Sequence, residues 1–203
     1  MMANSETLVD GALDDKKQSK VFAKAILHNA ERLSDMVSSL LDLSRIDYGE
    51  LKLNIEELPI NEHINKAIDS LKNLGKRKNI SIMCSCSKGK IVLADKNALE
   101  RILNNLIENA FKYSDSQSTI NISTKKVKDH LEISVKDSGR GIPDEEQDFL
   151  FDRFYRTAEA RATEEKGSGL GLAIVKNLVN NLNGEVGVKN AKPQGSIFWF
   201  TLP

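Results

Sequence analysis

A heptad of apolar side chains between Phe22 and Leu43 constrains the fold of this chain more than any other pattern. The apolar positions alternate at steps of four and three residues, and only Asn29 interrupts them. Further apolar residues on both flanks make the stripe wider than the seam of a two-stranded coiled coil. Because one helix cannot bury so wide a face alone, we expect a four-helix arrangement that forms a homodimer through the Phe22 to Leu43 helix.

Residues 6–13 are a candidate for the end of a partner helix. Gly11 and the acidic pair Asp14 and Asp15 would allow the chain to turn back antiparallel to the longer helix. We therefore predict a truncated dimerisation segment over residues 1–47, which holds the end of a first helix and a second helix.

The pattern changes after Asp47-Tyr48-Gly49, where alternating strands and amphipathic helices begin. This change predicts a second domain over residues 48–203. Its fold class is α+β, with a mixed, mostly antiparallel sheet and helices on one face. Strands are expected at 51–58, 79–87, 90–94, 119–127, 130–136, 185–189 and 196–202, and helices at 61–78, 95–113 and 170–182, with Asp95 as the cap of the second helix.

The charge balance argues against nucleic acid and lipid partners. Lys plus Arg equals Asp plus Glu at 29 each, so no global positive field attracts the chain to polyanions. The longest apolar runs are far shorter than the ~20 residues that span a bilayer, and no leader pattern opens the chain. We expect a cytoplasmic protein without membrane contact, and leave open whether a longer parent protein lies at the inner face of the cell membrane.

The two cysteines alternate with isoleucines along one strand face. Ile80, Ile82, Cys84 and Cys86 share that face, which predicts that both thiols belong to the core. A metal site would need more Cys or His nearby.

A polar stripe accompanies the apolar stripe of the helix at 95–113. Asn105, Asn109 and Lys112 fall at i, i+4 and i+7, although Asn is a poor helix former. An amide oxygen suits Mg²⁺, and a lysine one turn away suits phosphate. The alternative is a solvated polar face.

Two glycine-rich turns follow in the sequence. Asp137-Ser-Gly-Arg-Gly-Ile ends a strand, where the carboxylate can accept a hydrogen bond from an exocyclic amine such as that of adenine; the alternative is a tight turn. Gly167-Ser-Gly-Leu-Gly-Leu opens a helix, whose free N–H groups suit a phosphate chain. The chain has no G-x-x-x-x-G-K-[ST] motif, and Leu172 stands where G-x-G-x-x-G needs glycine, so Walker and Rossmann sites are excluded.

These motifs, taken in order, resemble the N, G1, F, G2 and G3 boxes of sensor histidine kinases, and the resemblance covers nearly the whole chain. The boxes are Asn105 with Asn109, Asp137-x-Gly-x-Gly, Phe151-Asp-Arg-Phe-Tyr-Arg, Gly167-x-Gly-x-Gly and Gly195-Ser-Ile-Phe. The resemblance implies a Bergerat-type α/β sandwich that binds ATP and Mg²⁺.

The same resemblance implies a role for each matched residue. Asn109 would coordinate Mg²⁺ and Asp137 would bind adenine, while residues 142–168 would form an ATP lid anchored by Phe151 and Phe154. The implied nucleotide-binding residues are Asn105, Asn109, Lys112, Tyr113, Asp137, Gly139, Gly141, Ile142, Phe154, Gly167, Ser168, Gly169, Leu170, Gly171 and Ser196. Asn105, Lys112 and Arg156 are the candidate catalytic residues; for Arg156, and equally for Arg153, a surface salt bridge is an equally good explanation.

The phosphoacceptor box of the family is missing. None of His28, His63 and His130 fits it, so we assign each of them a surface or packing role. We therefore expect the catalytic part of a two-component sensor histidine kinase, which passes phosphate from ATP to a histidine of a dimerisation domain and then to a response regulator receiver domain. Alternatives are a non-catalytic nucleotide-binding dimerisation scaffold and an anti-sigma-type serine kinase. A gyrase-type or chaperone-type ATPase typically carries Glu near position 105, where this chain has Asn.

Overall fold

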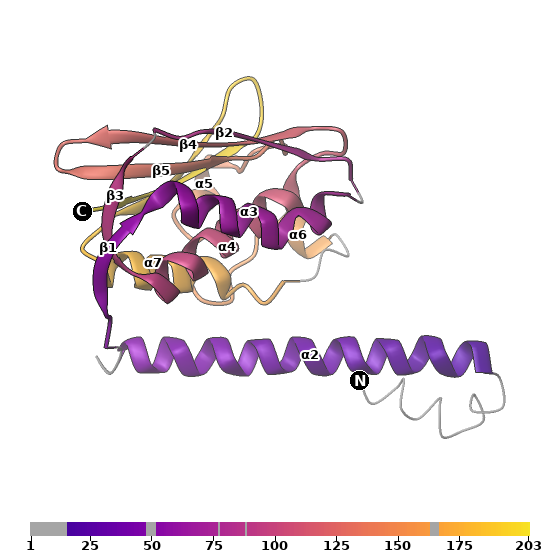
Figure 1. Ribbon diagram of the computed structural model, residues 1–203. Coiled ribbons are helices and arrows are strands. Elements are labelled where there is room, and N and C mark those ends of the chain that lie inside the picture. Colours follow the sequence, from indigo (N-terminus) through magenta and orange to yellow (C-terminus); the bar gives the residue numbers. More distant parts are fainter. Residues whose placement is uncertain (1–15, 48–51, 77, 88, 163–166) are drawn as a thin grey trace. The chain divides into compact units, whose positions relative to one another are not determined.

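The computed structural model describes residues 16–47, 52–76, 78–87, 89–162 and 167–203 (Figure 1). The chain divides into two compact units, Met1–Ser44 and Arg45–Pro203. The first contains almost all of helix α2 (Lys16–Asp47), which confirms a helix over the heptad and extends it at both ends. The proposed partner helix at 6–13 lies outside the described residues.

Several large apolar side chains of α2 are exposed. Val21, Leu27, Leu33, Val37, Leu40 and Leu41 are all at least 43% exposed.

The second unit contains two sheets and one layer of helices. A five-stranded sheet has the order β2 (Ser81–Ser85), β4 (Thr119–Val127), β5 (His130–Lys136), β7 (Ser196–Leu202) and β6 (Val186–Asn190). Only β2 and β4 are parallel, so the sheet is mixed and mostly antiparallel, as predicted. Strands β1 (Ile55–Pro59) and β3 (Ile91–Asp95) form a separate antiparallel pair. Helices α3 (Ile60–Lys76), α4 (Lys96–Tyr113) and α7 (Gly171–Asn181) lie on one side of the large sheet (Figure 1).

The core forms between the inner face of the sheet and the central helix α4. Alternation along the strands brings Ile122, Ile133 and Phe200 to that inner face, where each is fully buried. Leu99 and Leu106 are fully buried on α4 and belong to the predicted apolar stripe. Burial of each such side chain contributes about 1.5–3 kcal/mol, so α4 is held firmly against the sheet.

Both ends of α4 have hydrogen-bonded caps. At the start, Asp95 Oδ1 accepts a hydrogen bond of 2.9 Å from the N–H of Ala98, which confirms the predicted cap. At the end, Lys78 Nζ donates to the carbonyls of Lys112 at 2.6 Å and Ser114 at 3.2 Å. A cation at a helix C-terminus also interacts favourably with the helix dipole.

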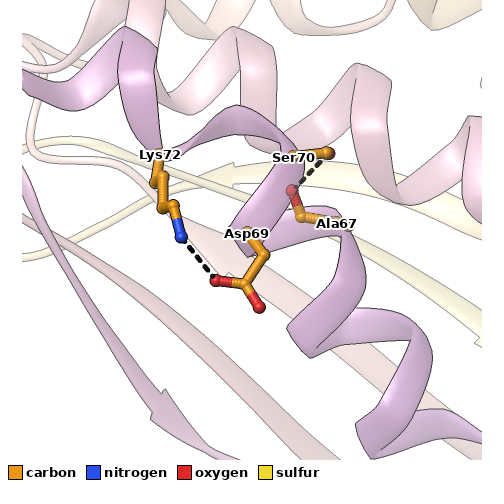
Figure 2. Close-up of polar contacts among 4 residues, drawn as sticks. All are labelled: Ala67, Asp69, Ser70 and Lys72. Atoms are coloured by element: carbon orange, nitrogen blue, oxygen red, sulfur yellow. Dashed lines mark hydrogen bonds and ion pairs between the residues drawn. The ribbon is translucent and has the colours of Figure 1, made fainter.

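Helix α3 covers α4 with one face and presents the other to solvent. Ile60, Ile64 and Ala67 are buried. Figure 2 shows polar contacts along this helix, where Lys72 Nζ lies 3.3 Å from Asp69 Oδ1 and Ser70 Oγ donates to the Ala67 carbonyl at 2.9 Å. Because the ion pair is exposed, it contributes at most about 1 kcal/mol.

The prediction that both thiols belong to the core is wrong. Cys84 is exposed and Cys86 is half-buried, although Cys84 pairs with Ile122 and so lies on the inner side of the sheet. The reason is that β2 is an edge strand, beyond which the described part of the chain adds no further strand to cover the side chains.

The segment between β5 and α7 has no strand in its described part, as predicted. It contains two short helices that the sequence did not indicate, α5 (Asp144–Gln147) and α6 (Ala158–Ala162). Its buried apolar residues in the described part include Leu150 at 8%, Ala160 at 7% and Leu170 at 0% exposure.

Candidate functional site

Helix α4 and the start of α7 meet at Asn105. The Asn105 amide nitrogen donates to the Arg101 carbonyl one turn back at 2.8 Å, and a β-carbon on Gly171 would lie 2.5 Å from the Asn105 amide oxygen. Because real β-carbons do not approach so closely, position 171 requires glycine while Asn105 keeps this orientation. The oxygen of Asn105 therefore lies at the N-terminus of α7, beside which α4 packs (Figure 1).

The last turn of α4 lies against two further glycines. A β-carbon on Gly167 would be 2.8 Å from Lys112 Nζ, and one on Gly139 would be 2.5 Å from the Tyr113 carbonyl. Lys112 Nζ also lies 4.9 Å from the centre of the Tyr113 ring, within cation–π range. Three glycines from two turns therefore lie close to α4, and a glycine leaves its backbone open to close approach by a ligand.

Asn109 lies one helical turn from both Asn105 and Lys112 and is half-buried. No residue in the described ranges hydrogen-bonds its side chain. The same ranges contain no group of three His, Cys, Asp or Glu that could hold a metal ion. The Asn109 side chain offers one amide oxygen, and Mg²⁺ at nucleotide sites usually takes few protein ligands and its others from phosphate and water.

Asp137 is a buried carboxylate that is held by two backbone N–H groups. Its Oδ1 accepts hydrogen bonds of 2.9 Å from Gly139 and 2.9 Å from Ser196, and the residue is only 3% exposed. Burial raises the pKa of Asp137 above its ordinary value, while the hydrogen bonds from Gly139 and Ser196 act in the opposite direction. With Oδ1 fixed in this way, Oδ2 is the atom that can accept a hydrogen bond from a ligand.

Another glycine, Gly195, makes the Asp137 arrangement possible. Gly195 has φ +101°, and a β-carbon there would collide with the Asp137 carbonyl oxygen. The N–H of Asp137 in turn donates to the Ser196 carbonyl at 2.9 Å. The G1 and G3 boxes are therefore joined directly, at positions 59 residues apart in the sequence.

The F and G2 boxes are also joined, through the backbone. The N–H of Phe154 donates to the Gly169 carbonyl at 2.9 Å, and Gly169 has φ +73° with no room for a β-carbon beside Phe154. The Phe154 ring is 59% exposed and its φ is +64°. Phe154 therefore contacts the G2 turn through its main chain, while its ring is exposed.

Helix α7 begins without a side chain that caps it from the N-cap position. Leu170 occupies that position, and its N–H donates to Ser168 Oγ at 3.2 Å. The first N–H groups of α7 are then available to an anion.

Arg156 contacts the short helix α6. Its guanidinium donates to the Ala160 carbonyl in α6, and its own carbonyl accepts from Arg161 Nε at 3.0 Å. Arg153 is exposed. These contacts hold Arg156 within the 142–168 segment.

Two histidines have the packing or surface roles that we assigned. His63 is 4% exposed and lies 3.6 Å from Glu100 across the α3 and α4 interface. His130, the first residue of β5, has its Nε2 atom 3.2 Å from the Asn183 carbonyl. The side chain of His28 lies outside the described part of the chain.

Sequence reasoning missed two side chains that fix the site. Lys78 caps the end of α4, as described above, and Asn190 binds the backbone of Ile142. The position of Asn190 at the end of a strand is a local signal for a turn, but it does not indicate the partner Ile142, which is 48 residues away in the sequence.

This fold, with two glycine-rich turns against one helix and a buried carboxylate at a strand end, is that of a nucleotide-binding α+β sandwich. The sequence profile of one family matches residues 94–203, and the chain belongs to that family, the histidine kinase-, DNA gyrase B- and HSP90-like ATPases.

Known histidine kinases resemble the chain beyond the matched residues. The sensor-like histidine kinase SenX3 of Mycobacterium tuberculosis (strain ATCC 25618 / H37Rv) is 36% identical over 199 residues, covering 98% of this chain and 48% of SenX3. The chain thus spans about half the length of this relative. The Acinetobacter baumannii histidine kinase AdeS has a TM-score of 0.82 at 25% identity, over 99% of this chain and 91% of AdeS.

A solved structure of full-length ShkA in complex with AMPPNP has a TM-score of 0.79 at 26% identity, over 92% of this chain and 39% of that one. These likenesses assign the second unit the fold of a histidine kinase catalytic domain. Among the helices in the described ranges, none combines the length and the apolar content of a membrane span.

Proposed function

We propose that this chain is the catalytic part of a two-component sensor histidine kinase, which transfers the γ-phosphate of ATP to a histidine of the dimerisation domain. The observation that carries the proposal is the lining of α4, where Gly171 faces Asn105, Gly167 faces Lys112 and Gly139 faces Tyr113. This lining brings the backbone of two glycine-rich turns, whose N–H groups suit phosphate oxygens, close to the polar stripe of one helix.

Asp137 would bind the adenine base. Its Oδ2 is available to accept a hydrogen bond from the exocyclic amine, because Oδ1 is already used by Gly139 and Ser196. Guanine carries an oxygen where adenine carries the amine, so a carboxylate at this place favours adenine.

The polar stripe of α4 and the start of α7 would hold the phosphates. Asn105 and Lys112 would contact phosphate oxygens, and the N–H groups at the start of α7 would stabilise their charge. Asn109 would hold Mg²⁺, which when bound supplies neutralisation of charge between the phosphates.

Arg156 remains a proposed catalytic residue. Its guanidinium is bound to the Ala160 carbonyl, so an action on the transferring phosphate requires that the side chain first leaves α6. If the side chain stays bound to the Ala160 carbonyl, Arg156 stabilises the position of α6 instead.

The partners follow from the same proposal. The exposed apolar side chains of α2, such as Leu33 and Leu40, would form a homodimer, and a response regulator receiver domain would accept the phosphate from the histidine. We place the chain in the cytoplasm, where ATP and response regulators are found.

The test is a phosphotransfer assay with γ-labelled ATP and Mg²⁺. The chain is incubated alone and together with a separate helical domain that carries the phosphoacceptor histidine of the parent protein. We expect acid-labile label on the added domain and none on the chain, because none of His28, His63 and His130 fits a phosphoacceptor box. Addition of a response regulator should then remove the label from the histidine domain.

Other outcomes point to the alternatives. Acid-stable label would indicate a serine kinase, and ATP binding without label on any partner would indicate a non-catalytic dimerisation scaffold. Acid-labile label on the chain alone would contradict the assignment of its histidines.

A further inference from the structure

Asn190, the last residue of β6, binds both polar groups of one residue in the G1 turn. Its Oδ1 accepts a hydrogen bond of 2.8 Å from the N–H of Ile142, and its Nδ2 donates one of 2.8 Å to the Ile142 carbonyl. A side-chain amide that pairs with N–H and C=O of one residue fixes both the position and the orientation of that residue.

A small network supports this two-point contact. Asp144 Oδ1 accepts from Asn190 Nδ2 at 3.2 Å and from Gln147 Nε2 at 2.8 Å. Gln147 Nε2 also donates to the Ile142 carbonyl at 3.2 Å. The start of α5 is therefore tied to the same asparagine.

The backbone before Ile142 is adapted to this neighbour. Gly141 has φ +87°, and a β-carbon on it would lie 2.9 Å from Asn190 Oδ1. Because Gly139 and Gly141 make the turn from Asp137 to Ile142 conformationally permissive, the turn does not fix its own shape. External contacts do so: Ser138 Oγ donates to the Thr119 carbonyl at 2.7 Å at the start of the turn, and Asn190 makes the contact at Ile142.

The same hairpin positions both ends of the turn. Asn190 pairs with Ser196 in the β6 and β7 register, and the N–H of Ser196 binds Asp137 Oδ1 at 2.9 Å. The hairpin therefore sets the distance between the Asp137 carboxylate and the Ile142 backbone.

We propose that Asn190 is a positioning residue that makes the nucleotide site selective for adenine, by holding Ile142 at a fixed distance from Asp137. This inference rests on the proposed function. A purine that fits between Asp137 and Ile142 must match that distance, whereas the phosphates are held by α4 and α7 and do not depend on it.

The test compares three ligands by competition with a fluorescent ATP analogue in the presence of Mg²⁺: ATP, GTP and inorganic tripolyphosphate. Asn190→Asp keeps the acceptor for the Ile142 N–H but loses the donor to its carbonyl, and Asn190→Ala loses both. Lys189→Ala, on the neighbouring exposed residue, is the matched control.

We expect both Asn190 variants to bind ATP about tenfold more weakly, which is the loss of about one such hydrogen bond. Their affinity for tripolyphosphate should stay within about twofold, because α4 and α7 hold the phosphates. Their preference for ATP over GTP should narrow, because the distance between Asp137 and Ile142 that selects adenine is no longer fixed. The melting temperature without ligand should stay within about 2 °C, because Asn190 is exposed. The Lys189→Ala variant should match the parent in all of these.

Two results would overturn the inference. One is an unchanged ATP affinity and ATP preference in both Asn190 variants while Asp137→Ala abolishes binding. The other is an equal loss of ATP and tripolyphosphate affinity, which would indicate general damage to the site. A parent chain that binds no ATP at all would instead refute the proposed function, and with it the basis of this inference.

Discussion

The amide oxygen of Asn105 lies 2.5 Å from the place that a β-carbon on Gly171 would occupy. Gly171→Ala must therefore displace either the start of α7 or Asn105, whose amide nitrogen is held by the Arg101 carbonyl. We expect ATP affinity to fall at least about tenfold, because a displacement of about 1 Å at a phosphate site is costly. Titration with a fluorescent ATP analogue measures the change.

Gly89→Ala is the matched control for this variant. Gly89 has φ +68° and an added β-carbon there would meet nothing within 4 Å, so alanine strains the backbone by about 1 kcal/mol without touching the site. An equal loss of ATP affinity in both variants would show that lost stability, rather than the contact with Asn105, is responsible.

The Asp137→Asn variant tests the buried carboxylate through pH. Because burial raises the pKa of Asp137, the folded state binds a proton more tightly than the unfolded state. The stability that Asp137 contributes is then present below its ordinary pKa and is lost as pH rises through the folded pKa. The amide of the variant does not titrate in this range, so we expect the variant to gain free energy of unfolding relative to the parent as pH rises.

Urea unfolding of both proteins between about pH 4 and pH 8 measures this difference, and a change in the opposite direction would contradict it. The same variant should bind ATP about a hundredfold more weakly at neutral pH, since an amide NH₂ would replace Oδ2 and face the exocyclic amine of adenine.

Lys78→Met should lower the free energy of unfolding by about 1–2 kcal/mol, because the carbonyls of Lys112 and Ser114 lose a charged donor at the end of α4. Lys78→Arg should retain part of that stability. Lys76→Met, at an exposed position of α3, should cost no more than about 0.5 kcal/mol. Urea unfolding compares the three, and equal losses at Lys76 and Lys78 would contradict the role of Lys78 as a cap.

Local patterns were sufficient to predict most of the elements. Strands β4, β5 and β7 have the predicted bounds, because their alternation is regular and turns delimit them. Helix α4 matches because Asp95 caps it and its apolar stripe is continuous. Strand β1 begins at Ile55, later than the predicted start at residue 51.

Properties that depend on distant parts of the chain could not be predicted. The exposure of Cys84 depends on the position of β2 at the edge of the sheet. The alternation of apolar residues within a strand does not determine the order of the strands. The contacts of Asn190 with Ile142 and of Lys78 with α4 likewise join residues far apart in the sequence. The glycines of the site were found because their motifs are local, whereas the side chains that hold those glycine turns were missed.

The two thiols should differ in reactivity. Cys84 is exposed, while burial and the neighbouring Cys84 raise the pKa of Cys86 to about 12, which leaves little reactive thiolate. With limiting iodoacetamide at about pH 8, we expect Cys84 to be modified at least about tenfold faster than Cys86. Fragment masses of the peptide that contains both residues locate the label. Faster labelling of Cys86 would contradict the edge-strand account.

The most direct test of the central claim is calorimetric titration of the chain with ATP, with and without Mg²⁺, beside the Asn109→Ala variant. We predict one ATP bound per chain, an affinity that falls at least about tenfold without Mg²⁺, and the same loss in Asn109→Ala with Mg²⁺ present. Absence of ATP binding, or binding that neither Mg²⁺ nor Asn109 affects, would contradict the assignment of this face of α4 as the ATP site.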